Sequence, residues 1–166
     1  TIPDHPDWIP YRTSYYQENW GFCIPHKQFV GLKDESYDVL IDSSLTDGSL
    51  TFGEFYLKGA KSDEVLISTH ICHPSLCNDN LSGIALSAIL GGHLSNVSLN
   101  YSYRFLFIPG TIGSITRLSL NRKCASKIKH GLVLACVGDS GKFTSKKTRI
   151  GNAEIDKVVA YLLKNS

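Results

Sequence analysis

The second half of the chain alternates between short apolar runs and segments with apolar residues at helical spacing. The apolar runs are rich in β-branched and aromatic residues, which predicts buried strands over 64–72, 103–110 and 130–139. The segments between and after them predict amphipathic helices over 80–94, 111–121 and 153–165. Strand–helix–strand repetition is typical of an α/β fold with a largely parallel sheet.

The first third of the chain has another pattern. Three prolines among the first ten residues predict an extended segment over 1–15. Strand-like runs at 29–32 and 37–45, a turn signal at 46–49 and a returning strand at 50–59 predict a hairpin. We therefore expect a small β-rich insert over 16–58, followed by an α/β core over 59–166.

Only three strands of the core sheet are obvious, fewer than a sheet covered on both faces usually has. The chain also contains no methionine, although a complete gene product starts with one. Together these features predict a truncated domain whose core is incomplete towards the C-terminus.

Composition narrows the functional classes. Apolar residues make up 42% of the chain, enough for a hydrophobic core. The net charge of +2 is too balanced to predict nucleic-acid binding. No apolar run approaches the roughly 18–20 residues of a membrane helix, so we expect no membrane partner.

The five cysteines indicate a reducing environment. Their number is odd and their spacing matches no zinc-finger or CxxC pattern. We expect buried free thiols and a cytoplasmic location. The cysteines are at positions 23, 72, 77, 124 and 136.

The loop over 70–80 carries the strongest candidate chemistry, because it follows a predicted strand and ligands bind at the carboxyl ends of strands in open α/β sheets. Zinc binds His nitrogen, Cys sulfur and Asp oxygen, and His73 and Asp79 could point into one cleft. Asp79 or Asn78 could instead only cap the following helix. A nucleophilic Cys72 or Cys77 beside His73 is a further, weaker alternative.

Two other loops follow predicted strands. The glycines and hydroxyls of 109–114 could bind an anion, although a tight strand-to-helix turn is the favoured interpretation. Asp139, in Gly-Asp-Ser-Gly, could be a metal ligand or acid, or could form an Asx turn. The basic residues over 142–149 are typical of a solvated connector.

Several blocks of the sequence carry a resemblance that covers nearly the whole chain. They are WGFCIPHKQ, IDSSLTDGSLTFGEF, HICHPSLCNDNLSG, YRFLFIPGTIGSI and VGDSG. The chain resembles an aminopeptidase-like family of otherwise unknown function, whose members occur with polysaccharide biosynthesis genes. That family is similar to zinc-dependent aminopeptidases with a phosphorylase/hydrolase-like fold. The resemblance implies a three-layer α/β/α sandwich with a mixed, largely parallel sheet and a β-rich insert.

The resemblance also implies roles for individual residues. His73 matches the first zinc-binding histidine, Asp79 the aspartate that holds or bridges metal, and Asp139 lies near a further acidic ligand. The zinc enzymes have a Glu-Glu pair after the second strand, and here those positions are Gly110 and Thr111. Glycine cannot relay a proton, and loss of a general base costs on the order of 10²–10⁴-fold in rate. His70 is an additional histidine where the family tends to have an aromatic residue. It could supply a nitrogen, although strand alternation places it on the face opposite to His73 unless the strand ends there.

We therefore predict a zinc-aminopeptidase-like hydrolase domain with weak or no activity, because Gly110 occupies the general-base position and a later family histidine is absent. Zinc is the expected cofactor, with His73, Asp79 and Asp139 as candidate ligands. The expected substrate is a peptide or a small amide-bearing molecule, and the chain could form a homo-oligomer. The alternative is a non-catalytic binding module in polysaccharide biosynthesis that uses the same cleft.

Overall fold

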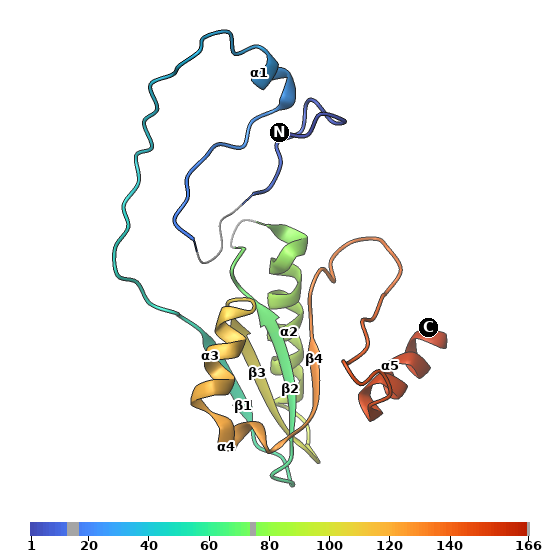
Figure 1. The fold of residues 1–166 in the computed structure, drawn as a ribbon. Coiled ribbons are helices and arrows are strands. Elements are labelled where there is room, and N and C mark those ends of the chain that lie inside the picture. The colour runs from blue at the N-terminus through green and yellow to red at the C-terminus, as the bar shows by residue number, and fades with distance from the viewer. Residues whose placement is uncertain (13–16, 74–75, 166) are drawn as a thin grey trace. The chain divides into compact units, whose positions relative to one another are not determined.

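The computed structural model describes residues 1–12, 17–73 and 76–165 (Figure 1). The chain divides into two compact units, Thr1–Thr46 and Asp47–Ser166. The larger unit contains the sheet. None of the helices within the described residues is both long and apolar enough to span a bilayer.

The unit Thr1–Thr46 contains one short helix, α1 (His26–Val30), within its described residues. Lys27 forms an ion pair with Asp7, and the backbone N–H of Lys27 donates to the carbonyl of Pro6 at 3.1 Å. The hairpin predicted before residue 59 is wrong. Residues 29 and 30 belong to α1, and 31–52 form no strand.

A four-stranded mixed sheet organises the unit Asp47–Ser166. Strands β2 (Glu64–His70), β3 (Ser102–Ile108) and β4 (Ile128–Val133) run parallel, and β1 (Gly53–Leu57) is antiparallel to β3. Their spatial order is β1-β3-β2-β4, so β2 lies between two parallel neighbours. The α/β fold and the mixed, largely parallel sheet are confirmed, and the predicted returning strand at 50–59 is β1, which pairs with β3.

Helices lie on both faces of this sheet. Helix α2 (Ser82–Leu94) packs on β2 and β3, where Phe105 and Ile67 are buried. Helices α3 (Ile112–Leu120) and α4 (Arg122–Ala125) lie on the opposite face, and a cavity of about 150 Å³ separates them from side chains such as Leu66 and Leu106. Side chains alternate between the two faces along a strand, so Phe105 faces α2 whereas Leu106 faces α3 and α4. Helix α5 (Glu154–Lys164) contacts β4.

A buried ion pair crosses the parallel strands at the end of the sheet remote from the loop over 70–80. Arg104 donates from Nε and Nη2 to the two carboxylate oxygens of Glu64, at 2.7 and 2.9 Å. These hydrogen bonds are the largest of the effects that hold the pKa of Arg104 above its ordinary value. Glu54 of β1 pairs with both Arg104 and Arg117, which ties α3 to the sheet.

The expected burial of the cysteines is wrong. All five are free, but Cys72, Cys77, Cys124 and Cys136 are exposed and only Cys23 is half-buried. Cys136 lies beyond the end of β4 and adopts a positive φ of 53°. The apolar run that predicted its burial ends as a strand at Val133, so the alternation of buried positions stops before Cys136.

Candidate functional site

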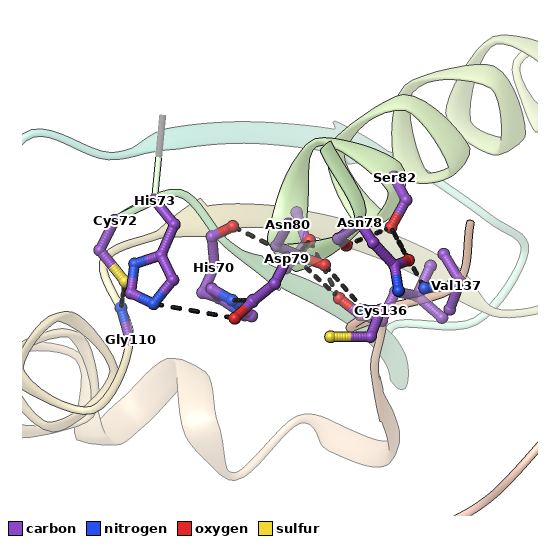
Figure 2. A network of polar contacts seen from close by, with 12 residues as sticks. His70, Cys72, His73, Asn78, Asp79, Asn80, Ser82, Gly110, Cys136 and Val137 are labelled. Carbon is purple, nitrogen blue, oxygen red and sulfur yellow. Dashed lines mark hydrogen bonds and ion pairs between the residues drawn. The ribbon is translucent and has the colours of Figure 1, made fainter. Parts of the chain in front are cut away.

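The candidate site forms where β2 ends and the chain turns into η1 (Cys77–Leu81), the irregular turn before α2 (Figure 2). His70 is the last residue of β2, and its Nε2 lies 2.5 Å from Oδ1 of Asp79. Nε2 of His73 lies 3.8 Å from the other oxygen, Oδ2. The two imidazole rings are 5.6 Å apart and edge-on, so Asp79 stands between two imidazoles that differ in distance.

Asp79 does not cap helix α2, which was the alternative left open for it. The helix begins at Ser82 with Leu81 in the N-cap position and no side-chain cap. Asp79 has φ −111° and ψ 83°, outside the helical region, and its side chain is 43% exposed. Its carboxylate is therefore held by the histidines and remains accessible to solvent and to ligands.

The sequence left the role of His70 open, and the structure gives it the shortest contact to Asp79. Its pairing with Ile108 places it at the carboxyl end of the parallel strands. That position was a usable signal, because ligand sites of open α/β sheets collect at this edge. With Nε2–H donating to the carboxylate, Nδ1 is the basic nitrogen of the neutral ring. A carboxylate that orients an imidazole in this way is a recurrent device in acid–base catalysis.

The side chain of Asn80 is 1% exposed and connects η1 to the sheet through hydrogen bonds. Its Nδ2 donates to Thr69 Oγ1 at 2.6 Å, to the His70 carbonyl at 3.2 Å and to the Leu134 carbonyl at 3.1 Å. Its Oδ1 accepts the backbone N–H of Cys136 at 3.1 Å. One side chain thus joins the end of β2 to the segment that follows β4. Because Asn80 is the next residue after Asp79, it also determines where the carboxylate lies.

The segment after β4 is held by Asn78 and Ser82. Asn78 Oδ1 accepts the backbone N–H of Gly138 at 2.8 Å, and Ser82 Oγ accepts that of Val137 at 3.1 Å. Asn78 Nδ2 donates to Asp139 Oδ2 at 3.0 Å. Asp139 Oδ1 accepts the N–H of Gly141 at 2.7 Å, which is an Asx turn. Asp139 is therefore engaged by Asn78 and its own turn, and its role as a metal ligand stays a prediction.

Gly110 follows β3 and faces the same site. Its backbone N–H donates to Cys72 Sγ at 3.3 Å. A Cβ atom at position 110 would lie 3.8 Å from Cβ of His70 and 3.4 Å from Cys72 Sγ. A side chain at this position would thus begin beside the His70–Asp79 pair. The absence of a carboxylate at 110 therefore concerns this site directly.

The side chains at this site are of types that bind zinc, but there are fewer of them than a catalytic zinc ion needs. Imidazole nitrogen and carboxylate oxygen are zinc ligands, and a catalytic zinc ion takes three protein ligands. Within the described ranges, no group of three or more His, Cys, Asp and Glu side chains is placed to hold a metal ion. Asp79 Oδ1 is already engaged by His70. The described residues alone thus offer fewer ligands than a catalytic zinc ion takes, and zinc binding stays a prediction.

Comparison with known proteins shows which proteins this chain is similar to and which family it belongs to. The chain is 55% identical over 163 residues to a protein of Clostridium acetobutylicum named "Putative polysaccharide biosynthesis protein with aminopeptidase-like domain". A crystal structure titled "putative peptidase" from the same species superimposes with a TM-score of 0.84 at 55% identity and covers 96% of this chain. The chain spans 38% of the length of each of these two proteins.

The family model described as "Domain of unknown function (DUF4910)" matches residues 1–166. The chain belongs to this family. The resemblance to an aminopeptidase-like family, which the CHP and NDNLSG blocks indicated, is thereby confirmed.

Proposed function

We propose that this chain is a zinc-aminopeptidase-like hydrolase domain with weak or no peptidase activity of its own. Its substrate class is a peptide or a small amide-bearing molecule. The observation that carries the proposal is the glycine at position 110, whose absent side chain would start beside His70. A site of this kind needs a group that takes a proton from water as it attacks the amide. Glycine offers none.

The remaining groups support an amide-binding site more than a complete catalytic one. Asp79 accepts hydrogen bonds and could bind the amino group of a peptide, since an ammonium group donates to a carboxylate. The half-exposed His73 could donate to or accept from an amide group of the same ligand. These contacts would position a substrate whether or not it is then hydrolysed.

Replacing Gly110 with glutamate tests the proposal. We expect the Gly110→Glu variant to hydrolyse leucine anilide in the presence of zinc about tenfold faster than the original chain. This is less than the roughly 10²–10⁴-fold effect of a general base, because the metal-ligand set is incomplete. Gly110→Gln is the matched control, because it has the same size but cannot act as a base. Release of the anilide product and the zinc content of each purified variant are the measurements.

The result that contradicts this proposal is equally definite. If neither variant contains zinc nor exceeds the uncatalysed rate, the domain is not an impaired peptidase of this type. If Gly110→Gln accelerates hydrolysis as much as Gly110→Glu, the acceleration comes from the size of the side chain. The proposal that position 110 lacks a general base would then be wrong.

A non-catalytic binding module is the second candidate, and the incomplete ligand set favours it. In that case the exposed carboxylate of Asp79 would bind an amine or amide ligand without turnover. Isothermal titration with a short peptide would detect it. Binding lost in Asp79→Asn and kept in Gly110→Gln supports the module.

We base the proposed cellular compartment on the free cysteines and the proposed absence of a nucleic-acid partner on the net charge. All five cysteines are free, which supports a reducing, cytoplasmic compartment. The near-balanced net charge of +2 gives no support for a nucleic-acid partner. A homo-oligomer remains part of the proposal, because β1 and β4 each have one edge without a neighbouring strand in this sheet.

A further inference from the structure

We draw no further inference here: the strongest candidate, the cavity of about 150 Å³ between the sheet and helices α3 and α4, is lined in part by the exposed side chains of Leu118 and Val133, and nothing in the structure shows what covers it in a chain that spans 38% of the length of its relatives.

Discussion

Replacing Asn80 with aspartate is expected to lower the free energy of unfolding by about 4 kcal/mol, the largest effect of any single change considered. The buried amide donates to two carbonyl oxygens and to Thr69 Oγ1. A carboxylate would put an acceptor against those carbonyls and bring an unpaired charge into a site that is 1% exposed. Chemical denaturation at neutral pH measures the change.

The pH dependence of the Asn80→Asp variant distinguishes the charge from a change of shape. Burial favours the neutral form of a carboxyl group, so its pKa should be higher in the folded state than in the unfolded state. Stability should then fall as the pH rises from the unfolded-state pKa to the raised folded-state pKa, and the loss should shrink towards about pH 4. A loss that is independent of pH would contradict the predicted buried charge.

Asn96→Asp is the control for this variant. Asn96 is exposed after α2, where its Nδ2 donates to the Gly92 carbonyl. The same chemical change there should cost less than about 1 kcal/mol, because solvent screens the new charge. A similar loss at both positions would show that Asn80 is not the special link between β2 and the segment after β4.

Replacing Gly83 with alanine is expected to lower the free energy of unfolding by about 3 kcal/mol. A Cβ atom there would lie 2.6 Å from each of three atoms, Asn80 Nδ2, Thr69 Oγ1 and the Leu134 carbonyl oxygen. All three belong to the hydrogen-bond network that positions Asp79, so the methyl group can be accommodated only if that network moves. The melting temperature should fall by about 10 °C.

Gly92→Ala in the same helix provides the matched control. No atom lies within 4 Å of a Cβ built at position 92. Alanine has the higher helix propensity, so this variant should be more stable by about 0.5–1 kcal/mol. Equal destabilisation by both substitutions would mean that helix α2 tolerates no alanine, and the close packing at Gly83 would not be the cause.

Comparing Asn80→Asp with Gly110→Gln separates effects on the position of Asp79 from direct effects on ligand binding. Loss of the Asn80 network should release the turn that presents Asp79, and ligand binding should weaken beyond what the fraction of unfolded protein explains. Gly110→Gln changes the site without entering that network, since a Cβ there meets only Cys72 and His70 at 3.4 Å or more. Comparing the two shows which losses come from positioning.

The sequence predicted regular elements well where a local period exists. Strands β2, β3 and β4 and helices α2, α3 and α5 each overlap the predicted range, because apolar runs and helical spacing are local properties. The prediction of a hairpin before residue 59 was wrong because it also rested on a local pattern alone. An alternating pattern at 37–45 is compatible with a strand, but a strand exists only if a partner supplies hydrogen bonds, and β1 obtains its partner from β3.

At the candidate site the sequence predicted that His73 and Asp79 converge, but it did not predict the contact between His70 and Asp79. The loop after β2 was recognised by its concentration of His, Cys and Asp, and the structure brings His73 within 3.8 Å of Asp79. The role of the closer partner, His70, was left open, because strand alternation places His70 and His73 on opposite faces unless the strand ends between them. Strand β2 ends at His70, so alternation no longer decides which residues beyond it meet.

The sequence by itself determined the α/β class, the order of strands and helices, the family blocks and the glycine at position 110, because each is a local pattern or the identity of one residue. Only the tertiary structure decided that His70 pairs with Asp79, that Asn80 joins the end of β2 to the segment after β4, and that Asp139 forms a turn. The physical reason is that these contacts depend on where separate strands end relative to one another. That arrangement depends on the register between strands that are far apart in the chain, since a shift by one residue turns every side chain to the other face.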